Sequence, residues 1–232
     1  MQRRCSMLFL LISLIFSAAS YSNQNTLTFN RPDNVPQANY VLELLNLAYK
    51  EIGYDIHLID FSPQNALRAA NNGGLDGQLG RDSSIEINFP NLLRVDFELF
   101  KFKLLLYKNC QQSILERLDN IAILANCPIQ AQYIKNTHFD GNVIEVKNLS
   151  TQLNLLTQGK VKGILLLDFA SDNQPINQHG LCYQKEVLRV TPVYHYLNKR
   201  HAHLIDGLKT ALNKLHNNGT VYALKAKYNM YD

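Results

Sequence analysis

Residues 67–79 read Leu-Arg-Ala-Ala-Asn-Asn-Gly-Gly-Leu-Asp-Gly-Gln-Leu, and residues 153–165 read Leu-Asn-Leu-Leu-Thr-Gln-Gly-Lys-Val-Lys-Gly-Ile-Leu. In both stretches an apolar helical segment ends at a glycine, Gly73 or Gly159, and a second glycine four residues later opens an apolar strand. A glycine that ends a helix and leads into a buried strand is typical of the helix-to-strand half of a βαβ unit. The two copies lie 86 residues apart and predict two lobes of similar architecture.

The same alternation extends outward from both stretches. Apolar residues recur at helical spacing in some segments, and short β-branched or aromatic runs lie between them. Alternating strands and helices predict an α/β fold with a mainly parallel sheet in each lobe. The first half reads as strand 26–29, helix 39–52, strand 55–61, helix 62–72 and strand 75–79, and the second as strand 120–125, helix 128–135, strand 143–146, helix 151–157 and strand 161–167.

Two long strand-like segments separate these halves from the C-terminal part. Residues 92–108 are longer than an ordinary strand within one lobe, so we expect them to cross from the first lobe to the second. Residues 186–196, with Pro192 among them, are the candidate for the return. The last forty residues read as helix, with leucines along one face and a stop at residues 217–219. Two crossings between two lobes predict a hinge.

Composition excludes several classes of protein. The chain has 232 residues, of which 46% are hydrophobic, enough for one large domain or two small ones. Lys and Arg number 23 and Asp and Glu 19; without Arg3 and Arg4, which we expect to be removed, the balance is 21 against 19, or +2. So small a net charge does not predict a nucleic-acid partner.

The N-terminus has the pattern of a secretory signal peptide. Arg3 and Arg4 precede an apolar run at residues 7–16, and small residues follow at 17–20. We therefore expect residues 1–20 to be cleaved and the mature protein to be soluble and exported. Cys5 precedes the apolar run, so it does not have the position of a lipoprotein cysteine.

The mature chain keeps three cysteines, Cys110, Cys127 and Cys182, an odd number for an oxidising compartment. At most one disulfide can form, and three pairings are open. The pairing of Cys110 with Cys127 closes the shortest loop and is the one the spacing favours. We do not expect a catalytic cysteine, because no neighbouring histidine or basic cluster would lower a thiol pKa.

Several motifs resemble a known family. They are the segment Pro63-x-x-Ala66-Leu67 with Asn71-Asn72-Gly73-x-Leu75-Asp76-Gly77, the run Asp76-Gly77-x-x-Gly80-Arg81, and Tyr194-His195-Tyr196-Leu197 before the C-terminal helix. Together, over about residues 26–228, they resemble a divergent branch of the bacterial extracellular solute-binding proteins of family 3. The resemblance implies a two-lobed type II periplasmic-binding fold, or Venus flytrap. Residues 21–97 and 190–232 would form the first lobe and residues 98–189 the second, with the ligand in the cleft between them.

In that family an arginine of the first lobe holds a ligand carboxylate, and an aspartate of the second lobe often holds the amino group. This sequence departs from the pattern at both places. The segment that usually carries the arginine has none, so Arg81, after the strand 75–79, would substitute for it. Asp168, after the strand 161–167, lies one position later than the family aspartate. An ion pair of Arg81 with Asp82 or Asp76, or a turn role for Asp168, is the structural alternative.

Three further residues are candidates for ligand contact. Asn30 and Arg31 end the first strand at the rim where a ligand of an α/β sheet binds. Tyr40 could wall the ligand, as could Phe61 and Tyr107, although aromatic residues at such positions are commonly core residues.

The sequence therefore predicts a binding protein. We expect it to capture a small polar ligand, amino-acid-like or a carboxylate, as a monomer and to pass it to the permease of an ABC-type transporter. One alternative is a sensor that presents its ligand-bound form to a membrane receptor. Another is a dehydratase-like enzyme with Asp168 or Glu86 as general acid or base. No catalytic residue, cofactor or metal ligand is predicted, because the common hydrolase and metal motifs do not occur in the sequence.

Overall fold

The computed structural model describes residues 25–110, 115, 118–125, 127–171 and 182–230. The predicted signal peptide at residues 1–20 lies outside these ranges. No helix within them is both long enough and apolar enough to cross a membrane.

The N-terminal lobe begins with strand and helix in alternation. Strand β1 (Asn25–Asn30) pairs in parallel with β2 (Tyr54–Ile59), and helix α1 (Pro36–Glu51) connects them. Helix α2 (Pro63–Asn72) then leads to β3 (Gly77–Arg81) and to a 3-10 turn, η1 (Ser83–Ile87). Both helices begin with proline, whose fixed φ suits the first helical turn, and α2 ends at Gly73 with φ 83°. These signals are local, which is why the sequence predicted these helices.

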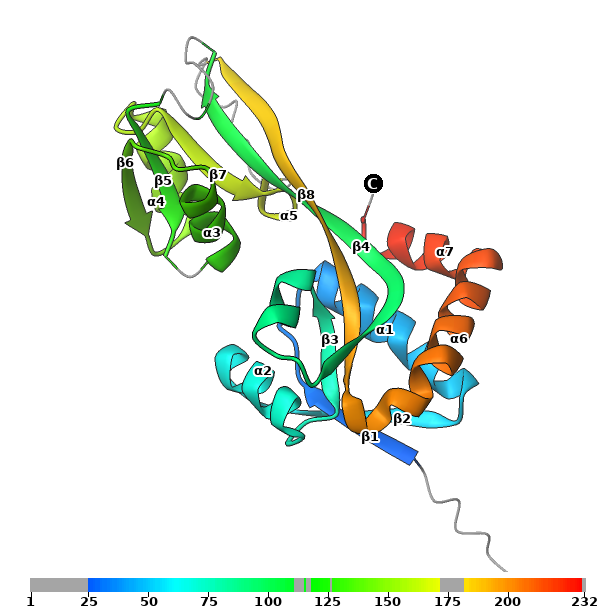
Figure 1. The fold of residues 1–232 in the computed structure, drawn as a ribbon. Coiled ribbons are helices and arrows are strands. Elements are labelled where there is room, and N and C mark those ends of the chain that lie inside the picture. Colours follow the sequence, from blue (N-terminus) through cyan, green and yellow to red (C-terminus); the bar gives the residue numbers. More distant parts are fainter. Residues whose placement is uncertain (1–24, 111–114, 116–117, 126, 172–181, 231–232) are drawn as a thin grey trace, which may run out of the picture.

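Two long antiparallel strands run through both lobes (Figure 1). They are β4 (Leu92–Asn109) and β8 (Tyr183–Asn198), and they confirm the two predicted crossings. Their register shifts between Val95 and Glu98, between Glu98 and Phe100, and again between Leu104 and Leu105. Such shifts bend and twist a strand pair, so the ribbon can leave one lobe and enter the other.

The second lobe is built around the far end of this ribbon. Strand β5 (Asn120–Leu124) pairs in parallel with β6 (Asn142–Val146) and β7 (Gly163–Leu167), and β7 pairs antiparallel with β4. Helices α3 (Pro128–Asn136) and α4 (Leu149–Thr157) connect the strands, and a short helix, α5 (Asp168–Ser171), follows β7. One six-stranded sheet, in the order β3-β8-β4-β7-β5-β6, therefore spans the molecule, with β1 and β2 in a sheet of their own.

The chain then returns to the first lobe. After β8, a 3-10 segment η3 (Lys199–Leu204) leads to α6 (Ile205–Asn217) and α7 (Thr220–Lys227), which lie beside α1 in Figure 1. The predicted stop after α6 is present, because Gly219 has φ 85°. The four leucines predicted to share a helical face are buried in the first-lobe core: Leu204, Leu208, Leu212 and Leu215.

The structure confirms that residues 67–79 and residues 153–165 have similar local structures. Gly73 and Gly159 both have left-handed backbones, with φ of 83° and 67°. Gly77 begins β3 and Gly163 begins β7. Each strand lies antiparallel to one of the two crossing strands, β3 to β8 and β7 to β4. The first of these strands begins later than predicted, since the Asp76 backbone N–H donates to the Thr28 carbonyl and holds the chain against β1.

The disulfide differs from the pairing that loop length favoured. Cys110 is bonded to Cys182, and Cys127 is a free thiol. Cys110 directly follows β4 and Cys182 directly precedes β8, where the pairing of Asn109 with Tyr183 brings the two chain ends together. The Cys110 N–H also donates to the Cys182 carbonyl at 3.0 Å. The expected pairing of Cys110 with Cys127 is therefore wrong, because strand pairing and not sequence distance sets the contact.

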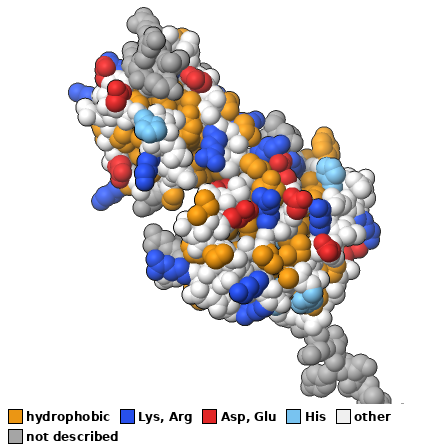
Figure 2. Space-filling model, viewed as in Figure 1, with side chains coloured by type: hydrophobic (Ala, Val, Ile, Leu, Met, Phe, Trp, Pro, Cys, Tyr) orange, Lys and Arg blue, Asp and Glu red, His pale blue; other side chains and the backbone are white. Residues whose placement is uncertain are grey.

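The surface shows no charge segregation on the face in view. In Figure 2, Lys and Arg alternate with Asp and Glu over the lobe that carries the C-terminal helices. Alternating charges of both signs agree with the small net charge expected for the mature chain.

Candidate functional site

A cavity of about 440 Å³ lies where the two lobes meet. The first lobe lines it with the segment after β1, the first turns of α1 and the end of β3. The crossing strands and the second lobe contribute Phe100, Phe102, Ile129, Leu167 and Phe169. The ends of β1, β2 and β3 all reach this edge, which is where ligands bind in open α/β sheets. The volume is in the range of small-molecule sites.

Arg81 is the charged residue best placed for a ligand. It ends β3, lines the cavity and is half-buried. Burial lowers the pKa of its guanidinium, and nearby Asp82 partly offsets this. Arginine nevertheless stays protonated in proteins, so Arg81 presents a positive charge to the cavity.

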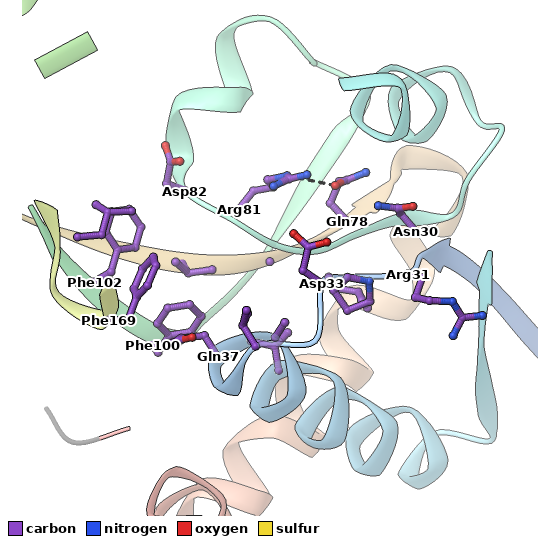
Figure 3. A pocket seen from close by; sticks show the side chains of 18 of the residues that line it. Asn30, Arg31, Asp33, Gln37, Gln78, Arg81, Asp82, Phe100, Phe102 and Phe169 are labelled. Atoms are coloured by element: carbon purple, nitrogen blue, oxygen red, sulfur yellow. Dashed lines mark hydrogen bonds between the residues drawn. The ribbon is translucent and has the colours of Figure 1, made fainter. Parts of the chain in front are cut away.

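One of the three guanidinium nitrogens of Arg81 donates a hydrogen bond within the protein, and the other two are available to a ligand. Its Nε donates to Oε1 of Gln78 at 3.1 Å (Figure 3). Within the described part of the chain, Arg81 forms no ion pair, and its two terminal nitrogens have no hydrogen-bond acceptor. The alternative of an ion pair with Asp76 is not observed, because Asp76 binds Arg200 and His201. Two adjacent open N–H groups suit a bidentate carboxylate.

Gln78 fixes the orientation of Arg81. Its side chain is only 4% exposed, and its Nε2 donates to the Ala66 carbonyl at 3.0 Å. That bond decides which end of the amide faces Arg81, namely the oxygen. Gln78 was not predicted from the sequence; the available signal was an amide side chain on the same strand as Arg81.

Asn30 and Arg31 line the cavity as predicted, but both also connect β1 to β2. Asn30 Oδ1 accepts the Phe61 N–H at 2.8 Å. Arg31 pairs with Asp60 at 2.9 Å and donates to the Leu58 carbonyl at 3.2 Å. In Figure 3 the Arg31 side chain extends away from Arg81. These residues form one rim of the cavity.

Two acidic residues complete the polar side. Asp82 caps η1 by accepting the Ser84 N–H at 2.9 Å. Asp33 follows β1, and its carboxylate lies on the same side as Arg81 and Gln78 in Figure 3. Neither was named as a ligand residue from the sequence.

Tyr40 and Asp168 lie outside the cavity lining. Tyr40 is 0% exposed, and its hydroxyl donates to the Leu99 carbonyl at 2.9 Å, which makes it a core residue of the first lobe. Asp168 begins α5, and its Oδ1 accepts the Phe169 N–H at 3.0 Å. Its neighbours in sequence, Leu167 and Phe169, do line the cavity.

Phenylalanines form the other side of the cavity. Phe100 and Phe102 come from β4, and Phe169 comes from α5. The rings of Phe102 and Phe169 meet edge to face, with centroids 6.5 Å apart. Of the aromatic residues considered from the sequence, Phe61 lines the cavity, whereas Tyr107 packs in the second lobe.

Glu86, a candidate acid or base for the enzymatic alternative, is elsewhere. It accepts the Tyr196 hydroxyl at 2.8 Å and pairs with Arg94 at 3.2 Å. It is not among the cavity-lining residues.

Comparison with solved structures identifies the fold. The probable amino-acid ABC transporter extracellular-binding protein YtmK of Bacillus subtilis matches with a TM-score of 0.69 at 17% identity, over 90% of this chain and 99% of that one. A putative L-cystine ABC transporter protein of Listeria monocytogenes matches with a TM-score of 0.65 at 19% identity, over 90% and 97% of the two chains. The GluR0 ligand-binding core of Nostoc punctiforme, solved with L-glutamate, matches with a TM-score of 0.62 at 17% identity, over 89% and 100%.

No protein-family model and no curated protein matches the sequence. The structural matches nevertheless confirm the two-lobed, type II periplasmic-binding fold that the sequence resemblance implied.

Proposed function

We propose that this chain, which has the fold of extracellular amino-acid-binding proteins, captures a small amino-acid-like or carboxylate ligand in its interlobe cavity. The observation that carries the proposal is Arg81, a half-buried cation whose open N–H groups face a cavity at the carboxyl ends of the strands. Burial disfavours the charge of Arg81, and a ligand carboxylate would add an opposite charge bound directly to its guanidinium. The names of the structural neighbours, two of them ABC transporter proteins, support the same role.

Ligand capture would proceed by closure of the two lobes. We propose residues 21–97 and 190–232 as the first lobe and residues 98–189 as the second. The hinge is then the pair of crossing strands near Glu98 and Val190, close to the register shifts of β4. Closure would bring the second lobe toward Arg81 and could bring Asp168, at the start of α5, nearer to the ligand. A role for Asp168 is a prediction for that closed form.

The partner and location follow from this role. An exported binding protein of this fold would deliver its ligand to an inner-membrane permease, and we propose a periplasmic monomer without a lipid anchor. Intact-mass analysis of the full chain exported by a bacterial host tests the location. We expect a mass corresponding to cleavage near Ala19 or Ser20; retention of residues 1–20 in the exported protein would contradict it.

The test of ligand capture is a thermal-shift screen of the exported protein against amino acids, small organic acids, amines and sugars. A ligand at a hundredfold excess over its Kd stabilises the folded form by about 2.7 kcal/mol, which raises the melting temperature measurably. We expect the hits to carry a carboxylate and to be lost in Arg81→Gln.

Arg68→Gln is the matched control. It removes the same charge from an exposed position on α2, outside the cavity, and should keep every hit. Hits without a carboxylate, or hits that survive Arg81→Gln, would contradict the assigned role of Arg81. A panel with no hit would contradict ligand capture itself.

A further inference from the structure

The cavity has a mainly polar side and a mainly apolar side, although Gln37 lies next to Phe100 in the view of Figure 3. Arg81, Gln78, Asn30 and Asp33 gather on one side, from the ends of β1 and β3. The three phenylalanines lie together on the other side, away from these polar groups. A ligand that reaches across the cavity must therefore present different chemistry at its two ends.

The apolar side extends into the second lobe. Beyond the phenylalanines, Ile129 from α3 and Leu167 from β7 line the cavity there. Every lining residue from residues 98–189 is thus apolar, and no described side chain among them can form an ion pair or a strong hydrogen bond. A charged or amide side chain of a ligand would lose its water at this surface without gaining a partner, which costs free energy.

The phenylalanines are supported in place but are still open to a ligand. Phe102 is 6% exposed and packs edge to face on Phe169, which is 39% exposed. Phe100 is braced by Tyr40 at a centroid distance of 6.4 Å, also edge to face. The Asp168 carboxylate binds the N–H of Phe169 and so holds the first turn of α5. An exposed aromatic ring beside a buried one gives a flat apolar surface for a third ring or a branched aliphatic group.

We propose that the ligand is a small carboxylate with an apolar body, its carboxylate on Arg81 and its body against Phe102 and Phe169. This rests on the proposed ligand-capture function and narrows the ligand class. It also departs from the small polar ligand expected from the sequence, since the described residues of the second lobe contribute no polar lining group.

Two kinds of small carboxylate have an apolar body, and they differ in whether they carry an ammonium group. An apolar amino acid carries an ammonium group, and a simple aryl or alkyl acid does not. Two described carboxylates line the cavity. Asp82 already accepts the Ser84 N–H, and Asp33, on the polar side with Arg81, is the one we place at a ligand ammonium. A comparison of the two kinds of ligand therefore tests whether Asp33 takes part.

The experiment is calorimetric titration of the full chain with L-phenylalanine, 3-phenylpropionate, L-glutamine and L-arginine. We expect at least one of the two phenyl ligands to bind at least tenfold more tightly than L-glutamine and L-arginine. Phe169→Ala should weaken that binding by about tenfold, because it removes the exposed ring of the apolar side. Tyr222→Ala, which truncates an aromatic side chain 80% exposed on α7, should leave it unchanged.

The outcomes separate this inference from the function on which it rests. Tight binding of L-glutamine or L-arginine that is lost in Arg81→Gln would overturn the apolar ligand class and leave ligand capture standing. Phenyl-ligand binding that Phe169→Ala does not weaken would overturn the assigned position of the body. Binding of none of the four, together with no hit in the wider screen, would overturn both. A preference for L-phenylalanine that is lost in Asp33→Asn would support an amino acid as the ligand. Equal binding of both phenyl ligands would support a simple acid.

Discussion

At the scale of single residues, the structure separates side chains that face the cavity from side chains that support it. Arg81 faces the cavity, and Gln78 holds it through one hydrogen bond. Beneath them, His195 is 0% exposed. Its Nδ1 lies 3.2 Å from the Leu79 carbonyl and its Nε2 lies 2.7 Å from the Tyr49 hydroxyl. Because a carbonyl only accepts, Nδ1 carries the proton and Nε2 accepts from Tyr49.

This neutral histidine makes the stability of the protein depend on pH. Burial lowers the pKa of His195 from 6.5 to about 4, although hydrogen bonds to the backbone partly oppose the shift. Between these values the unfolded chain binds a proton that the folded chain does not. The free energy of unfolding should therefore fall as the pH decreases from about 6.5 to about 4, by up to about 3 kcal/mol.

Urea denaturation of the wild type and of His195→Gln at pH 4.5, 5.5 and 7 measures this effect. The variant lacks the titrating group, so its unfolding free energy should decrease less over the same interval. Parallel pH profiles for the two proteins would show that His195 does not carry the effect.

At the scale of elements, the sequence predicted the regular parts well and the connections between them poorly. Helices with proline at the start and glycine at the end, such as α2, are specified by their own residues. The wall of the cavity is not specified in this way. Phe100 and Phe102 lie on the same face of β4 whatever its pairing register, and only tertiary packing decides that this face lines a cavity. Helix α5 and the disulfide also depend on contacts between distant segments.

Gly77 and Gly163, which begin β3 and β7 at corresponding positions, offer a matched pair for testing how closely these strands pack. A Cβ on Gly77 would lie 2.1 Å from the Tyr196 carbonyl oxygen, which is backbone of β8 and cannot move aside. A Cβ on Gly163 would meet the Leu118 and Leu106 side-chain methyls at 2.8 Å and 3.0 Å, and these can shift.

We therefore expect Gly77→Ala to lower the free energy of unfolding by about 3 kcal/mol or more and Gly163→Ala by about 1 kcal/mol. Chemical denaturation of both variants checks the order. An equal loss for the two would contradict the close approach of β3 to β8.

The disulfide joins the ends of β4 and β8 across a sequence separation of 72 residues. Closing a loop of this length restricts the unfolded chain, and the entropic relation gives a stabilisation of up to about 4 kcal/mol. The double variant Cys110→Ser, Cys182→Ser should lose much of this in urea denaturation, whereas Cys127→Ser should retain it. A larger loss in Cys127→Ser would contradict the pairing.

At the scale of the whole molecule, two lobes share one six-stranded sheet through a pair of crossing strands, and the cavity lies beside that crossing. The polar lining groups come from the first lobe, and the described lining residues of the second lobe and of β4 are all apolar. A ligand in contact with both sides would favour the closed arrangement, since only closure buries both of its ends.

Small-angle X-ray scattering of the exported protein, with and without each carboxylate of the screen at millimolar concentration, tests this most directly. We predict that at least one carboxylate decreases the radius of gyration of the wild type and leaves that of Arg81→Gln unchanged. A radius of gyration that no carboxylate alters, or one that decreases equally in Arg81→Gln, would contradict closure around a ligand held by Arg81.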